Sequence, residues 1–176
     1  MNGPPDPAWE RATDLLSCLE SVLSEYGAEA CRTFVAPGGS PAWDACCDCG
    51  NGEGMAWVQI SQVFPTDNFP AAQTGAFRCP PTGYGVQLVV GILRCAATLD
   101  DTGRAPSQER LTSDAEKVQR DRAIVQEAIR CCYVDDADPG SYAIGSWTPL
   151  GPTGGCVGGQ TTLSVVVPSC RCPDHG

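Results

Sequence analysis

The segment Tyr84–Cys95 reads YGVQLVVGILRC and carries the strongest strand pattern in the chain. Its residues are apolar at nearly every position from Val86 to Leu93. Strands that are apolar on both faces are typical of sheets that are covered on both sides. We therefore expect a strand here that is buried on both faces.

Four weaker strand patterns accompany this segment. Residues 55–64 alternate in a way that places Val58, Ile60 and Phe64 together on an inward face. The other candidates are Cys31–Ala36, Tyr142–Pro149 and Gln160–Val167. The sequence therefore predicts five strands in all.

Two glycine-rich runs, Gly50–Gly54 and Gly151–Gly159, adjoin these strands. Neither is followed by Lys-Ser or Lys-Thr and a helix, so neither matches a phosphate-binding loop. Glycine-rich connections between strands are typical of hairpins. We expect both runs to be loops, and such a loop can also order as an assembly arm on a neighbouring subunit.

Two helices are predicted from apolar spacing and from capping residues. Asp6 and Pro7 mark the start of the first helix, and Gly27 marks its end. Ser113 and Glu116 form a capping-box pair that predicts the start of the second helix, which runs to about residue 133.

The predicted order is α-β-β-β-α-β-β, which indicates an α+β fold. We expect a mostly antiparallel sheet with two packed helices, because hairpins with short loops join neighbouring strands. We expect one domain over residues 1–176, with its core at about 7–167 and flexible ends at 1–6 and 168–176. The size of 176 residues suits a single hydrophobic core.

The charge balance argues against nucleic-acid binding. Lys and Arg number 11 against 21 Asp and Glu, which gives a formal net charge of −10. The second helix interleaves its charges, which is typical of a solvated face; these are Lys117, Arg120, Arg122 and Arg130 with Glu116, Asp121 and Glu127. We expect no sequence-specific nucleic-acid binding, no membrane-spanning segment and no secretory signal.

Twelve cysteines are the sharpest chemical signal in the chain. They can form disulfides or lie as buried thiols, and redox catalysis is a third reading. A fourth is a zinc site, whose candidate ligands are Cys46, Cys47, Cys49, Cys170, Cys172 and His175. The spacings C-C-x-C and C-x-C differ from the usual C-x₂₋₄-C, so we expect neither a metal nor a cofactor. Cys131 and Cys132 are adjacent at a helix end, so we expect at least one of them to be in the core or bonded elsewhere.

The residues of ordinary acid–base catalysis are sparse. The one histidine, His175, stands next to the last residue, where a second residue to orient it is hard to supply. The remaining carboxylates are mostly in predicted loops. We therefore expect that the chain is not an enzyme.

Several stretches together resemble tail-terminator, or neck, proteins of long-tailed actinobacterial phages. They are CDCGNGEGMAWVQISQVFP (Cys47–Pro65), VQLVVGILRCAAT (Val86–Thr98), AIRCC (Ala128–Cys132) and WTPLGPTGGCVGG (Trp147–Gly159). The last stretch is the most specific. The resemblance extends over residues 7–167, and the predicted order of elements also resembles the tail-terminator fold.

The resemblance implies a virion structural protein without catalytic residues. It implies a homohexameric ring that ends the tail tube at its head-proximal end, contacts the tail tube protein and the head-side connector, and leaves DNA free to pass. Such a protein is assembled in the host cytoplasm and resides in the virion. We expect the ring contacts at Trp147, Pro149, Leu150, Gly154, Gly155 and Val157. Two alternatives are a head-tail stopper or head-completion protein of the neck, and a cysteine-stabilised or zinc-bearing binding module.

Overall fold

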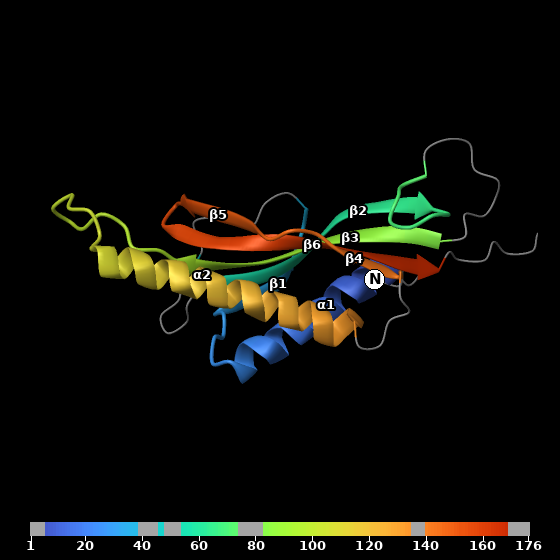
Figure 1. The fold of residues 1–176 in the computed structure, drawn as a ribbon, viewed down its shortest axis with the longest axis horizontal. Helices are drawn as coiled ribbons and strands as arrows, with labels where there is room; N and C mark the ends of the chain where they lie inside the picture. The colour runs from blue at the N-terminus through green and yellow to red at the C-terminus, as the bar shows by residue number, and fades with distance from the viewer. Residues whose placement is uncertain (1–5, 39–45, 48–53, 74–82, 135–139, 169–176) are drawn as a thin grey trace, which may run out of the picture.

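The computed structural model describes residues 6–38, 46–47, 54–73, 83–134 and 140–168. It has an α+β architecture in which both helices lie against one face of a long sheet (Figure 1). The elements are α1 (Pro7–Glu25), β1 (Arg32–Ala36), β2 (Met55–Thr66), β3 (Gly83–Cys95), α2 (Gln108–Ile129), the π-helical η1 (Arg130–Val134), β4 (Tyr142–Ile144), β5 (Thr148–Thr153) and β6 (Cys156–Pro168). The predicted fold class and order are confirmed, with the segment 142–149 present as parts of two strands.

The sheet has six strands in the order β1-β2-β3-β6-β4, and β5 pairs with β6 beside β4. Only β1 and β2 are parallel, and the other pairs are antiparallel. β3 pairs with β2 and with β6 along most of its length. The segment YGVQLVVGILRC therefore forms the centre of the sheet.

The two faces of β3 carry different partners. Val86, Leu88, Val90 and Ile92 are fully buried in the main apolar core, which they share with residues of α1 and α2. On the opposite face, Gly91 lies directly across from an aromatic residue of β2, as does Gly85. These aromatic residues are Trp57 and Phe64, and a Cβ atom at either glycine would come within 2.5 Å of their rings. The glycines thus make room for rings that cover the second face.

A β-bulge in β2 changes one predicted orientation. The pairing register shifts between Ile60 and Gln62, so Ser61 is an extra residue, and its hydroxyl donates to the Gln87 carbonyl at 3.0 Å. One extra residue reverses the alternation of side chains along a strand. Val58 and Ile60 therefore belong to the helix-covered core as predicted, whereas Phe64 lies on the other face, so that part of the prediction was wrong.

The first helix begins where its sequence indicates. The Asp6 carboxylate accepts a hydrogen bond from the Ala8 amide at 3.0 Å and caps α1. The second helix begins earlier than predicted, because Ser107 is its N-cap and accepts from the Arg110 amide at 3.3 Å. Ser113 and Glu116 lie inside α2, so the capping-box start was wrong.

The first turns of α2 are held by bonds to the segment after β3. Asp114 on α2 accepts from the Ala97 amide at 2.8 Å. Within that segment, Asp100 accepts from the hydroxyl of Thr102 and from the amides of Thr102 and Arg104, and these bonds lower its pKa. The polar stretch before α2 is therefore an ordered turn.

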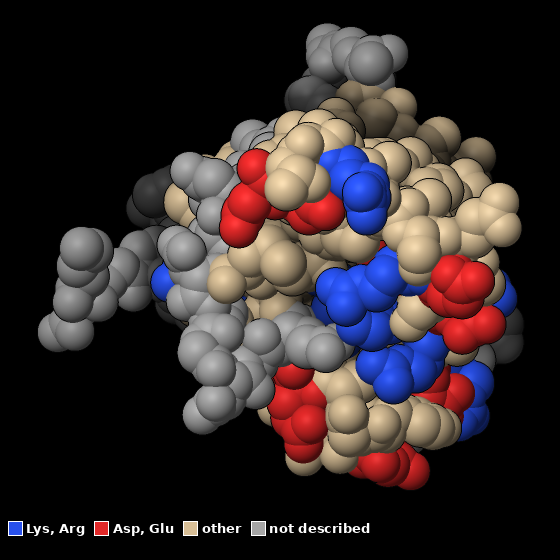
Figure 2. Space-filling model, turned by 90° about the vertical axis from the view of Figure 1, so that its left-hand side faces the viewer, with Lys and Arg blue, Asp and Glu red and all other residues tan. Residues whose placement is uncertain are grey.

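The end of the molecule that is at the left in Figure 1 carries charges of both signs. Figure 2 shows that basic side chains gather near the middle of this end, with acidic side chains on both sides of them. Arg130, the first residue of η1, donates to Glu127 of α2 at 2.6 Å, which lowers the pKa of that carboxyl. Asp121 differs from the predicted solvated face, because it is fully buried.

No helix in the described part of the chain is both long and apolar enough to cross a membrane. Of the chain ends that we expect to be flexible, residues 1–5 and 169–176 lie outside the described residues.

Candidate functional site

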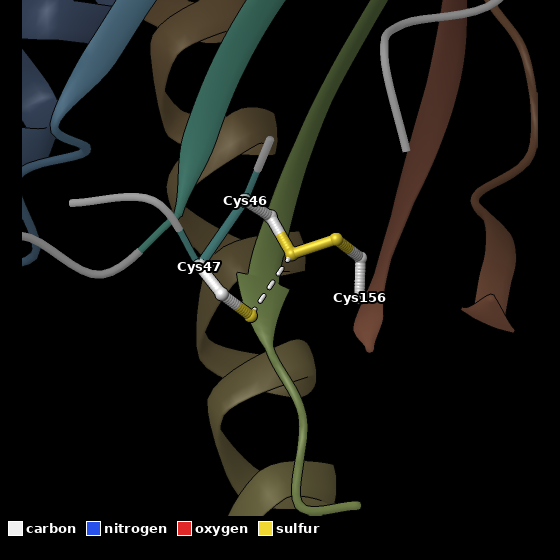
Figure 3. A group of neighbouring side chains, drawn as sticks. All are labelled: Cys46, Cys47 and Cys156. Atoms are coloured by element: carbon white, nitrogen blue, oxygen red, sulfur yellow. Dashed lines mark hydrogen bonds between the residues drawn. A yellow bond between two sulfur atoms is a disulfide. The ribbon is translucent and has the colours of Figure 1, made fainter. Parts of the chain in front are cut away.

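Four cysteine sulfurs gather at one end of the sheet. Cys95, the last residue of β3, pairs directly with Cys156, the first residue of β6. Cys46 forms a disulfide with Cys156, and Cys47 forms one with Cys95. Figure 3 shows that the side chains of Cys46 and Cys47 point toward each other, with their sulfur atoms 3.5 Å apart. The two disulfides therefore lie in contact.

This four-sulfur cluster, formed by Cys46, Cys47, Cys95 and Cys156, has a buried side and an open side. Cys46 and Cys156 are fully buried in a second apolar cluster, on the sheet face away from the helices. That cluster also contains Ala36, Met55, Trp57 and Leu93. Cys47 and Cys95 are exposed.

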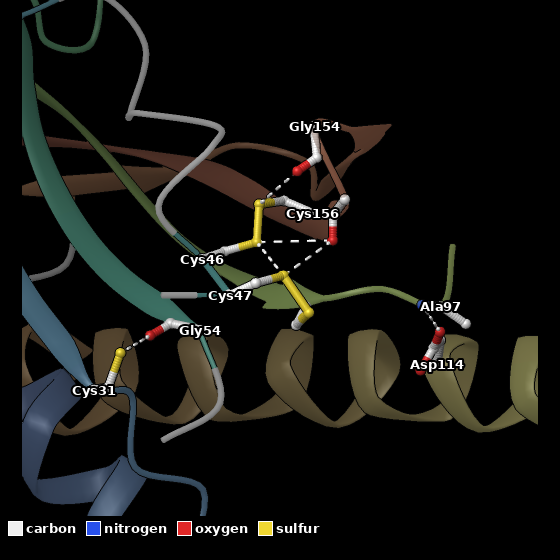
Figure 4. The surroundings of a disulfide bond; sticks show 10 residues. Cys31, Cys46, Cys47, Gly54, Ala97, Asp114, Gly154 and Cys156 are labelled. Carbon is white, nitrogen blue, oxygen red and sulfur yellow. Dashed lines mark hydrogen bonds between the residues drawn. A yellow bond between two sulfur atoms is a disulfide. The ribbon is translucent and has the colours of Figure 1, made fainter. Parts of the chain in front are cut away.

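One backbone carbonyl lies beside the four-sulfur cluster. The Gly155 oxygen is 3.5 Å from the Cys47 sulfur and 3.8 Å from the Cys46 sulfur (Figure 4). Sulfur atoms in a disulfide carry no proton, so these distances describe packing contacts in the disulfide state. In the thiol state the same carbonyl could accept an S–H hydrogen bond.

The cysteines that lie together in the structure are not the set that the sequence analysis grouped as candidate ligands. Of the candidate ligands of the alternative zinc site, Cys46 and Cys47 belong to the four-sulfur cluster, and the others lie outside the described residues: Cys49, Cys170, Cys172 and His175. Cys95 and Cys156 were missed because they are 61 positions apart in sequence (156 − 95) and only the β3–β6 register brings them together. The twelve-cysteine count alone could not identify them.

Three further cysteines among the described residues carry disulfides elsewhere. Cys18 on α1 is bonded to Cys132 on η1, which confirms that at least one of Cys131 and Cys132 is bonded elsewhere. Cys31 is also disulfide-bonded, and its sulfur lies 3.1 Å from the Gly54 carbonyl oxygen. Disulfides therefore tie together the two helices as well as the end of the sheet.

The predicted contact residues lie in the β5–β6 hairpin. The run Gly151–Gly159 was expected to be a loop, but only Gly154 and Gly155 form the turn between the two strands. The rest of the run belongs to β5 and β6, because its glycines allow close strand contacts. A Cβ at Gly158 would lie 2.0 Å from the Ile92 carbonyl oxygen, and one at Gly159 would lie 2.3 Å from the Trp147 ring.

The hairpin offers only part of the predicted contact surface. Pro149 and Gly154 are exposed, whereas Gly155 and Val157 are half-buried. Trp147 and Leu150 are half-buried as well, and they pack against the main core and the second apolar cluster respectively. The exposed outer edge of β5 is thus the part that another molecule can contact.

Among the described residues, two opposite edges of the sheet pair with no further strand over part of their length. On one side, β1 pairs with β2 only as far as Ala36 and Gln59. Beyond that point no strand among the described residues pairs with the outer edge of β2, and Val63 is 50% exposed there. On the other side, β4 and β5 each pair with β6 alone, and Ile144 is 48% exposed.

A pocket of about 160 Å³ lies between α1, β1 and the segment that connects them. It is lined by Glu20, Leu23, Glu29, Ala30 and Thr33. The Thr33 hydroxyl donates to the Glu20 carboxylate, so part of its polar lining is already engaged.

The similarity that comparisons with known proteins find is a similarity of structure. No protein-family model matches the chain, and no curated protein matches it. Among solved structures, the chain is similar to the PVC sheath/tube terminator of an extracellular contractile injection system, in its extended state. The two are 10% identical with a TM-score of 0.31, and the alignment covers 99% of this chain and 60% of that chain. The chain thus spans less than two thirds of that protein's length.

Proposed function

We propose that this protein is a tail terminator, a structural subunit of a phage virion. In this role it forms a ring at the head-proximal end of the tail tube and joins the tube to the head-side connector. It acts through binding rather than catalysis. The observation that carries the proposal is the pair of open edges on opposite sides of one sheet.

Open edges on opposite sides favour head-to-tail assembly. An exposed strand edge presents unpaired backbone N–H and C=O groups that can pair with another chain. When a surface of one copy binds a different surface of the next, the contact is heterologous, and such contacts close into rings when the rotation permits. This fold supplies two such different surfaces. One is the outer edge of β2 near Val63, and the other is formed by the outer edges of β4 and β5.

The most specific stretch of the family resemblance forms one of these edges. WTPLGPTGGCVGG runs from Trp147 through β5 and into the start of β6. We assign the contacts with the neighbouring subunit to this hairpin, with Pro149 and Gly154 outermost and Trp147, Leu150, Gly155 and Val157 supporting them. The ring is a hexamer in this proposal, as the resemblance implies.

The remaining features are consistent with such a subunit. A net charge of −10 suits a ring through which DNA passes without being held, because like charges repel. A protein assembled in the reducing cytoplasm of the host and released with the virion would form its disulfides after release. The proposed partners are other copies of this chain, the tail tube protein and the head-side connector.

The size and shape of the particle in solution test this proposal. We expect the purified full chain to give rings with a central hole in negative-stain images, and a hexamer mass by mass photometry. Binding to the purified tail tube protein, and not only to the connector, separates a terminator from a head-tail stopper. A particle that remains monomeric at all concentrations, and with the tube protein present, contradicts the proposal.

A further inference from the structure

We propose that the four-sulfur cluster binds one Zn²⁺ ion when its cysteines are thiols. The ligands are Cys46, Cys47, Cys95 and Cys156, a set that differs from the candidate ligands considered in the sequence analysis. Only Cys46 and Cys47 are common to both sets. The inference is independent of ring assembly, because all four ligands come from one chain.

The arrangement of the sulfur atoms carries this proposal. Zinc binds cysteine sulfur at about 2.3 Å in a tetrahedron, which places the sulfur atoms about 3.8 Å from one another. The sulfur atoms of Cys46 and Cys47 are 3.5 Å apart, and those of Cys46, Cys47 and Cys156 all lie within 4.8 Å of one another. Cys95 is bonded to Cys47, so its sulfur joins the same group.

The fold, rather than local spacing, creates the ligand set. Cys95 and Cys156 are directly opposite on neighbouring antiparallel strands, which sends their side chains to the same face of the sheet. Cys46 and Cys47 are adjacent in sequence, yet their side chains point toward the same place (Figure 3). Their unusual spacing is therefore no obstacle to a shared metal.

Only small movements separate the disulfide state from a zinc site. A disulfide holds its two sulfur atoms about 2 Å apart, so each pair needs to separate by roughly 2 Å to reach the tetrahedral spacing. Side-chain rotation can supply this for Cys47 and Cys95, since both are exposed. The buried pair, Cys46 and Cys156, needs the same separation within the second apolar cluster. The same exposed side is the entry path for the ion, while the buried side is shielded by Trp57 and its apolar neighbours.

Binding of zinc to the four cysteines involves no redox step. The newly synthesised chain carries four thiols, and a Zn²⁺ ion replaces their four protons to give a tetrathiolate complex. Later oxidation removes four electrons, which two equivalents of a small-molecule disulfide accept together with four protons from the solvent to become four thiols. Two disulfides form, and Zn²⁺ leaves unchanged in oxidation state. Zinc would thus hold the correct pairs together before oxidation, among twelve cysteines that could pair otherwise.

Metal analysis of the reduced full chain tests the assignment. The chain is purified with a phosphine reductant, supplied with Zn²⁺ and challenged with a chromophoric chelator. We expect one zinc per chain in the wild type, and loss of this zinc to the chelator in Cys95→Ser and Cys156→Ser. Co²⁺ in place of zinc should give the absorption bands of a tetrahedral thiolate site in the wild type only.

A control variant and a labelling experiment keep the test decisive. The double variant Cys18→Ser/Cys132→Ser removes a disulfide of α1 and η1 outside the cluster, and it should retain its zinc. In the wild type, zinc should slow alkylation of Cys46, Cys47, Cys95 and Cys156, as located by mass spectrometry. Unchanged zinc in Cys95→Ser and Cys156→Ser would place the ligands elsewhere and overturn the proposal, as would a reduced wild type that binds no zinc.

Discussion

Arg94 on β3 and Asp121 on α2 form a buried ion pair with two hydrogen bonds. The guanidinium donates from Nε to one carboxylate oxygen at 2.8 Å and from Nη2 to the other at 2.7 Å. Nη2 also donates to the Ala28 carbonyl at 2.9 Å, just beyond the end of α1. The two side chains are 2% and 0% exposed. One side chain thus joins the central strand, the second helix and the segment after the first helix.

Removal of either partner of this pair should destabilise the protein strongly. Arg94→Met leaves a buried carboxylate without its partner, and Asp121→Leu leaves a buried guanidinium. Each change should lower the free energy of unfolding by about 3–5 kcal/mol. The double variant should lose much less than the sum of the two, because it leaves neither charge uncompensated. Urea denaturation of the four proteins gives the coupling, and additive losses would show that the two charges do not depend on each other.

The same pair marks a limit of what the sequence can tell. Periodicity identified both helices, because burial of one face imposes it on the residues directly. The central strand was identified by its continuous apolar run, because both of its faces are covered. Asp121 was placed on a solvated face because its neighbours in sequence are charged, and its partner Arg94 is distant in the chain. The bulge at Ser61 and the true start of α2 at Ser107 also depend on tertiary contacts. Only two residues of the four-sulfur cluster could be grouped from the sequence, because Cys46 and Cys47 are adjacent. Cys95 and Cys156 come together only through strand register.

The disulfide between Cys46 and Cys156 should contribute strongly to stability in the oxidised protein. It closes a separation of 110 residues, and in the chain-entropy model such a link stabilises by about 4–5 kcal/mol. Cys46→Ser/Cys156→Ser should lower the free energy of unfolding by roughly that amount. Denaturation is measured with a metal chelator present, so that zinc does not contribute.

The control for this prediction is a disulfide of similar span elsewhere in the fold. Cys18→Ser/Cys132→Ser removes a link across 114 residues and should cost a similar amount. After full reduction of all three proteins, the wild type and the two variants should have about the same stability, because no disulfide then distinguishes them. If oxidised wild type and Cys46→Ser/Cys156→Ser unfold at the same denaturant concentration, this disulfide does not stabilise the fold.

Gly91 should be intolerant of a side chain because Trp57 lies across from it. A Cβ there would come within 2.5 Å of the indole ring, and Trp57 is fully buried. Gly91→Ala should therefore cost about 1–3 kcal/mol through overpacking, measured by thermal or urea unfolding. The smaller ring of Trp57→Phe frees space, so adding Gly91→Ala to that variant should cost less than adding it to the wild type. Equal costs in both backgrounds would mean that the ring does not limit this position.

Tyr133 should make the stability of the protein fall in alkaline solution. Burial raises its pKa to about 12, and its hydroxyl donates to the Arg11 carbonyl at 2.8 Å. An unfolded tyrosine titrates near pH 10. The stabilisation is therefore complete below about pH 10 and is lost as pH rises toward about 12, by up to roughly 3 kcal/mol.

Phenylalanine at this position should remove that pH dependence. Tyr133→Phe should cost about 1 kcal/mol at neutral pH through the lost hydrogen bond, and should flatten the decline between pH 10 and 12. Urea midpoints across this range measure both effects. Tyr26→Phe is the matched control, since Tyr26 is 55% exposed. A decline in Tyr133→Phe as steep as in the wild type would assign it to other groups.

Lysine at either open edge should prevent ring assembly while leaving the fold intact. Val63 and Ile144 are about half exposed, at 50% and 48%, so neither substitution removes a fully buried side chain. A lysine on an edge strand disfavours pairing with another chain. Val63→Lys and Ile144→Lys should each give monomers by mass photometry. Leu111→Lys on α2, at a residue 53% exposed, is the control that should still form rings.

A mixture of the two edge variants tests the head-to-tail geometry itself. Val63→Lys keeps its β4–β5 edge, and Ile144→Lys keeps its β2 edge, so one intact contact can form between them. Because the outer edges of that pair are both blocked, assembly should stop at the dimer. If the same edge bound its own copy, the mixture would contain only the homodimers that each variant forms alone. Heterodimers in the mixture and monomers in the separate samples are therefore the outcome that head-to-tail pairing requires, and rings in either separate sample would contradict it.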